Sequence, residues 1–87
     1  MEKIFTTRLK NALAKFVRGH ISAHFIVNDT LLVEIDYGAT LYRYTLSDIS
    51  TKISNGLTSE MVCKDICKQY KRYIFNKYFY AESEKIS

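Results

Sequence analysis

Two histidines and two cysteines are the residues whose types and spacing most suggest metal chemistry. His20 and His24 stand four positions apart, and so do Cys63 and Cys67. Positions i and i+4 share a face of a helix, where either pair can chelate Zn²⁺. His24, however, belongs to an alternating, strand-like stretch, and four strand residues span roughly 13 Å, too far for both histidines to reach one ion. We therefore predict no metal site and interpret the cysteines as small buried hydrophobic residues.

Other catalytic arrangements are also weakly represented. Glu34 and Asp36 share one face of a predicted strand, as in a paired-acid site, but outward carboxylates also keep a sheet face soluble. Gly19, Gly38 and Gly56 each stand at a predicted turn or helix end, which leaves no glycine-rich loop for a phosphate. Neither cysteine follows a strand–turn–helix elbow. The sequence thus predicts a non-enzymatic protein without a cofactor.

Size and composition favour a small folded protein. The chain has 87 residues, of which 47% are hydrophobic and 25% charged, with three Gly and no Pro. This composition excludes a disordered chain and a disulfide-stapled mini-protein. No apolar run approaches the ~18 residues of a membrane span. Two reduced thiols fit a reducing compartment, and the first residues lack the apolar core of a secretory signal. We expect a cytoplasmic protein with no membrane partner.

The first half of the chain changes from a helical to a strand-like pattern. Apolar residues at helical spacing predict a helix over 2–18, with Phe16 on its apolar face and Gly19 as its left-handed end. Period-two alternation then predicts three strands within 22–46, joined by two short turns as an antiparallel meander. One face of this sheet should pack on helices, and the other should stay half solvated.

The helical pattern returns in the second half. Ser47 is expected to cap a short helix, which the Asn-Gly pair at 55–56 ends. Thr58 or Ser59 then caps a long helix that runs to about Tyr78.

These elements predict a single two-layer α+β domain over residues 1–80, in the order α-β-β-β-α-α. No linker, repeat or low-complexity stretch divides it. The polar tail, 81–87, is expected to fray.

The last helix is predicted to have two distinct faces at about 100° per residue. One broad apolar arc should face the core, and it comprises Val62, Cys63, Ile66, Cys67, Tyr70, Tyr73 and Ile74. The opposite arc mixes cations with phenylalanines, and it comprises Lys64, Lys68, Lys71, Arg72, Phe75 and Phe79. Either the two phenylalanines cover the first helix or the sheet edge, or they form an exposed contact site.

An exposed strip of cations and phenylalanines suits two kinds of partner. Aromatic anchors inside a charged rim can dock on an acidic groove of a protein. Alternatively, lysines can neutralise phosphates while the rings stack on unpaired bases. Because the net charge is only +4, we favour a protein partner, bound through the last helix. Nucleic-acid binding by the same strip, together with Arg8, Lys15 and Arg18 of the first helix, is the alternative. Homodimerisation is a third possibility.

The element order is similar to that of double-stranded RNA-binding domains. That family reads RNA partly through a lysine-rich start of its last helix. The corresponding stretch here, TSEMVCK at 58–64, has no such cluster, and the short helix at 47–55 has no counterpart. We therefore do not adopt this interpretation.

A second resemblance spans the whole chain. The stretches LLVEIDYGATLYRYTLSDIS and KQYKRYIFNKYF, in a Lys-, Ile-, Tyr- and Asn-rich chain, resemble accessory proteins of phages and prophages from AT-rich Gram-positive bacteria. Some of these, including Cas9-inhibiting anti-CRISPRs, share the α-β-β-β-α-α order. The resemblance implies an accessory protein or inhibitor that binds a host protein. The DNA imitation used by acidic members does not carry over to a basic chain.

Overall fold

The structure, a computed structural model, contains three helices and three strands in the predicted order. It describes the backbone of residues 2–86 and the side chains of residues 3–77. The elements are α1 (Glu2–Leu13), β1 (His20–Ile26), β2 (Thr30–Tyr37), β3 (Thr40–Leu46), α2 (Ile49–Ser54) and α3 (Ser59–Ile86). The predicted α-β-β-β-α-α fold of the α+β class is therefore confirmed.

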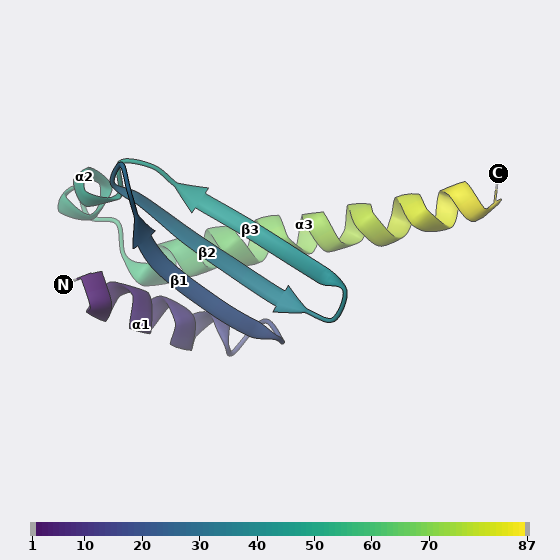
Figure 1. The fold of residues 1–87 in the computed structure, drawn as a ribbon, viewed down its shortest axis with the longest axis horizontal. Coiled ribbons are helices and arrows are strands. Elements are labelled where there is room, and N and C mark those ends of the chain that lie inside the picture. The colour runs from purple at the N-terminus through teal and green to yellow at the C-terminus, as the bar shows by residue number, and fades with distance from the viewer. Residues whose placement is uncertain (1, 87) are drawn as a thin grey trace.

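The three strands form one antiparallel sheet in the order β1-β2-β3. Ile35 of the central strand lies opposite Ile21 on one side and Tyr42 on the other. α1 contacts β1 and α3, and α3 crosses the sheet on the same side (Figure 1). The other face is open to solvent and carries a cross-strand ion pair, with 3.1 Å between Arg43 Nε and Glu34 Oε2. This is the one-sided burial that the alternation predicts.

The hydrophobic core lies between this sheet and the helices. Its fully buried side chains come from α1, β2, α2 and α3, and they are Leu9, Leu13, Leu31, Val33, Ile35, Ile49, Val62 and Ile66. Each buried aliphatic side chain contributes roughly 1.5–3 kcal/mol of transfer free energy. Cys63 is also buried, and Cys67, Tyr70 and Tyr73 pack against the core from α3. The arc predicted to face the core therefore holds the last helix against the sheet, except for Ile74, which lines a surface hollow instead.

α1 ends earlier than the sequence predicts, at Leu13 instead of residue 18. The next residues form a tighter turn, in which Phe16 N–H donates to the Leu13 carbonyl over 2.9 Å. Gly19 is therefore not the helix end; it lies against β2 with a φ of 108°. Because the chain must reach the start of β1, tertiary pairing overrides the helical pattern. The predicted core position of Phe16 is wrong, since its side chain is 72% exposed.

α2 is held at its start by a residue from the β1–β2 turn. Ser47 was expected to cap this helix, but Asp48 precedes it, with a left-handed φ of 54° and no side-chain cap bond. Instead, Ser50 N–H donates to the Asp29 carboxylate over 3.2 Å, and Ser50 Oγ donates to the same group over 2.5 Å. Ile49 N–H also donates to the Asp29 carbonyl over 3.1 Å. The start of α2 is therefore capped by Asp29, which stands 21 residues before Ser50 in the sequence.

We expect Asp29→Gly to lower the free energy of unfolding by about 1 kcal/mol, because the helix start loses its acceptor. Asp29 has a φ of 52°, which glycine adopts without strain, so the substitution isolates the carboxylate. Asp48→Gly is the matched control, since Asp48 has a similar φ but caps nothing. Its stability should be unchanged or slightly raised. Urea unfolding of both variants checks the prediction, and equal losses would contradict it.

α3 begins as the sequence predicts and extends further than expected. Thr58 caps it, because Met61 N–H donates to Thr58 Oγ1 over 3.2 Å. The helix runs to Ile86, past the predicted end near Tyr78, and projects beyond the sheet (Figure 1). The side chains of the predicted tail lie outside the described residues, so its fraying stays a prediction.

Candidate functional site

The cations and phenylalanines predicted to form one strip lie around two different hollows of the surface. Lys64, Lys68 and Lys71 line a groove between α3 and the end of α1. Arg72 lines a separate polar hollow beside β3, to which Lys68 also contributes. Phe75 lies where the groove continues along α3, and Phe79 lies outside the residues whose side chains are described. The predicted strip is therefore divided, and most of its described part borders the groove.

This groove, hereafter the α1–α3 groove, consists of two adjoining hollows. The first has a volume of about 790 Å³ and is lined by Ala12, Lys15, Phe16, Glu60, Cys63, Lys64, Cys67, Lys68 and Lys71. The second has a volume of about 470 Å³ and is lined by Phe16, Val17, Cys67, Tyr70, Lys71, Ile74 and Phe75. Phe16, Cys67 and Lys71 line both. Two helices that pack against each other thus leave a long apolar channel open to solvent.

Two phenylalanines stand exposed in the α1–α3 groove. Phe75 is 63% exposed and Phe16 is 72% exposed. For Phe75 this favours the contact-site interpretation over the covering one. Phe16 was missed as a site residue because the helical pattern assigns it to the core. The early end of α1, which turns its ring outward, leaves no signal in the local sequence.

The rim of the α1–α3 groove is basic. Lys15 contributes from the α1 side, while Lys64, Lys68 and Lys71 contribute from α3. Among the described side chains, none of these lysines forms an ion pair. Glu60 is the single acid at the rim, and its own backbone N–H at the start of α3 lowers its carboxyl pKa. Four cations against one anion give the groove a positive potential.

The cysteines and histidines lie on opposite sides of the sheet. Cys63 is buried under α3 and Cys67 is half-buried on the groove floor. His20 and His24 are both exposed on β1, on the face away from the helices. Across the described residues, no group of three or more His, Cys, Asp or Glu side chains is placed to hold a metal ion. The four residues that first suggest metal chemistry are not brought together.

Burial raises the pKa of the Cys63 thiol to about 11, with a smaller contribution from the neighbouring Cys67. The thiol ionises at lower pH in the unfolded chain, near 9. Its contribution to stability is therefore complete below about pH 9 and is lost as the pH rises towards 11. The unfolding free energy should fall with pH across this window, and in Cys63→Ala the slope of this fall should be smaller. The difference in slope is at most about 1.4 kcal/mol per pH unit, which corresponds to the release of one proton. Urea unfolding from pH 8 to 11 measures it, and parallel curves would contradict it.

The contacts between α3 and β3 fix the position of the groove's longer wall. Tyr44 Oη donates to Asp65 Oδ2 over 2.8 Å, and Gln69 Nε2 donates to the same oxygen over 3.1 Å. Burial, with help from this hydrogen bond, raises the pKa of the Tyr44 phenol. The Tyr42 ring lies 5.3 Å from that of Tyr70, centre to centre. These contacts hold α3 on the sheet and leave its lysine face turned towards the groove.

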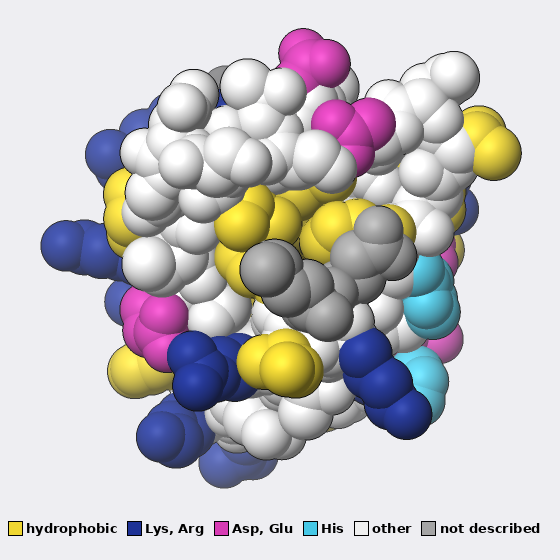
Figure 2. Space-filling model, turned by 90° about the vertical axis from the view of Figure 1, so that its left-hand side faces the viewer, with side chains coloured by type: hydrophobic (Ala, Val, Ile, Leu, Met, Phe, Trp, Pro, Cys, Tyr) yellow, Lys and Arg dark blue, Asp and Glu magenta, His cyan; other side chains and the backbone are white. Residues whose placement is uncertain are grey.

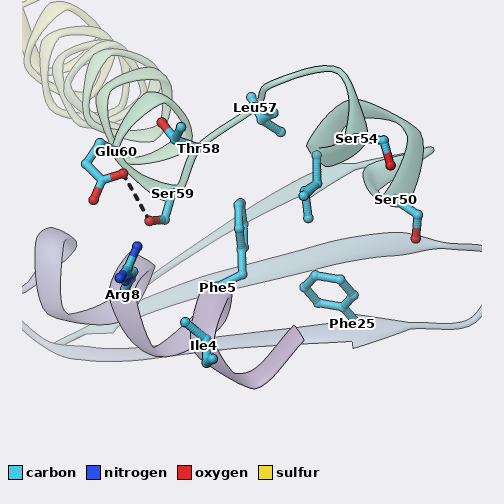
Figure 3. Close-up of a pocket in the computed structure, with 11 residues that line it drawn as sticks. Ile4, Phe5, Arg8, Phe25, Ser50, Ser54, Leu57, Thr58, Ser59 and Glu60 are labelled. Atoms are coloured by element: carbon cyan, nitrogen blue, oxygen red, sulfur yellow. Dashed lines mark hydrogen bonds between the residues drawn. The ribbon is translucent and has the colours of Figure 1, made fainter. Parts of the chain in front are cut away.

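A third cavity lies at the end of the molecule where α1, α2 and α3 begin. Figure 2 shows hydrophobic side chains in a hollow at this end. The cavity measures about 460 Å³. Phe5 enters it from α1 and Phe25 from β1 (Figure 3), and their ring centres are 6.2 Å apart. At its rim, Ser59 Oγ donates to Glu60 Oε2 over 3.3 Å. This cavity was not predictable from the sequence, because its walls come from four separate elements.

Comparison of the chain with protein-family models, with curated proteins and with solved structures finds no match. The resemblance to phage accessory proteins therefore stays a prediction. Within residues 2–86, no helix is both long enough and apolar enough to cross a membrane. The function has to be inferred from the geometry of the site itself.

Proposed function

We propose that this chain is a non-enzymatic protein-binding module whose site is the α1–α3 groove. One observation carries the proposal: an apolar channel, open to solvent, lies between lysines of α3 and Lys15 of the turn after α1. Exposed apolar surface of this kind is a feature of contact sites, and a polar rim around apolar anchors is the usual anatomy of a protein interface. The resemblance to phage accessory proteins, which implies the capture of a host protein, supports the same class.

The groove floor favours a protein over a nucleic acid. Its side chains include Ala12, Cys67 and Ile74. Binding buries these side chains most favourably against apolar side chains of a partner, because both apolar surfaces are then removed from water. A sugar–phosphate backbone offers no such groups. The net charge of +4 is also small for a phosphate-binding surface.

Affinity capture from an extract of the organism that encodes the chain tests this function. The bait is compared with the double variant Lys68→Glu/Lys71→Glu, each with and without nuclease. We expect the same polypeptide on the original bait after nuclease treatment, and at least tenfold less on the variant. Both baits should melt at similar temperatures, because the two lysines are exposed.

Two results would contradict the proposal. Binding that disappears with nuclease would assign the groove to nucleic acid. Equal capture by both baits would place the site elsewhere. With the purified partner, the logarithm of the affinity should fall only shallowly with the logarithm of salt concentration, since few phosphate-like charges are neutralised.

A further inference from the structure

Phe16 lies where the two hollows of the α1–α3 groove adjoin, as do Cys67 and Lys71. The Phe16 side chain lines both hollows and is largely exposed. The α3 residues that line the two hollows are centred about six positions apart, or roughly 9 Å along a helix that rises ~1.5 Å per residue. From Glu60 to Phe75, the α3 wall runs for about 22 Å by the same measure. The groove has the length of about four helical turns.

The two long walls of the groove are a helix and a hydrogen-bonded turn, and the backbone N–H groups of that turn, from Ala14 to Val17, all donate to carbonyls of α1. α3 forms one wall, and the end of α1 with the turn after it forms the other. The backbone N–H and C=O groups of a helix are hydrogen-bonded within the helix. These walls therefore offer no row of free backbone groups with which an extended segment could pair as a strand. A strand laid here would leave its own polar groups without protein partners. A helix satisfies its backbone internally and needs only side-chain contacts.

Building on the proposed function, we propose that the α1–α3 groove receives an acidic amphipathic helix of the partner protein. Large apolar residues at positions i and i+7, about 10.5 Å apart, would enter the two hollows, which adjoin at Phe16. Lysines stand on both walls, Lys15 on one and Lys64, Lys68 and Lys71 on the other. Acidic residues on both flanks of the incoming helix would therefore face cations.

Selection from a library of displayed 16-residue peptides tests this assignment. The folded 87-residue chain is the target, and Lys64→Glu/Lys71→Glu is used for counter-selection. We expect the enriched peptides to be acidic and to carry large apolar residues at i and i+7. Moving one of those residues to i+5, on another helix face, should weaken binding at least tenfold at equal composition. Enrichment of basic peptides, of peptides without helical spacing, or of none at all would overturn the proposal.

Cys67 provides an independent readout of where the selected peptide lies. It is half-buried and lines both hollows, whereas Cys63 is buried and lines only the first. Bound peptide should slow alkylation of Cys67 by iodoacetamide at least threefold. Unchanged alkylation of Cys67 would overturn the assignment. If affinity capture depends on the groove but peptide selection fails, the helical partner is wrong and the protein-binding function stands.

Discussion

Gly19→Ala is expected to lower the free energy of unfolding by about 3 kcal/mol or more, which would consume much of the stability of a domain this small. A Cβ atom at this position would lie 2.5 Å from the Asp36 carbonyl oxygen and 2.9 Å from Tyr37 Cβ. The φ of 108° adds strain for any residue with a side chain. Because the oxygen belongs to the backbone of β2, it cannot move without disturbing the sheet.

Gly56→Ala is the control that separates the steric clash of an added Cβ from the backbone strain of a positive φ. Gly56 has nearly the same φ, 105°, but an added Cβ would meet nothing within 4 Å. Its loss should be about 1 kcal/mol, the cost of the backbone conformation alone. Melting followed by circular dichroism should show a drop of roughly 12–24 °C for Gly19→Ala, at 4–8 °C per kcal/mol. Similar drops for the two variants would show that Gly19 does not approach β2 this closely.

The elements were predictable where short-range periodicity coincides with burial. Leu31, Val33 and Ile35 alternate in the sequence and are fully buried on one face of β2. Val62 and Ile66 stand one turn apart and face the core. In these segments the hydrophobic pattern and the tertiary structure require the same conformation, so sequence alone is sufficient.

The ends of elements were less predictable, because distant contacts decide them. α1 stops at Leu13 although its apolar pattern continues to Val17, since the chain must enter β1 beside Asp36. α2 starts after Asp48 because Asp29, in another turn, supplies its cap. Neither event has a signal within a few residues. The same explanation applies to Gly19, whose apparent role as a helix end is replaced by close packing against β2.

Only one wall of the α1–α3 groove could be predicted from the sequence, because the other depends on how two distant segments pack. The periodicity of one helix reveals the face of that helix, and Lys64, Lys68 and Lys71 were found in this way. A groove has two walls, and the second comes from α1 and the turn after it. Lys15 of that wall was expected only in the nucleic-acid alternative, and Phe16 was assigned to the core, so their place beside the α3 lysines became clear only from the packing of α1 against α3.

Phe16→Ala and Phe5→Ala should have opposite consequences, although both residues belong to the same apolar repeat in the sequence. Phe5 is 9% exposed and its ring contacts Phe25, so its removal from the core should cost about 3–5 kcal/mol of stability. Phe16 is 72% exposed, so its removal should change the unfolding free energy by no more than about 0.5 kcal/mol. Its loss should nevertheless weaken partner binding at least tenfold, because its exposed ring lines both hollows.

Phe75→Ala completes the comparison, since Phe75 is an exposed groove residue on α3. It should weaken binding while the domain stays folded, as for Phe16→Ala. Urea unfolding gives the stability of each variant, and capture of the partner on equal amounts of folded bait gives the binding. If Phe16→Ala unfolds the domain as Phe5→Ala does, the ring serves the core. The α1–α3 groove would then lack the exposed ring that lines both of its hollows, and Phe16 would not be a contact residue.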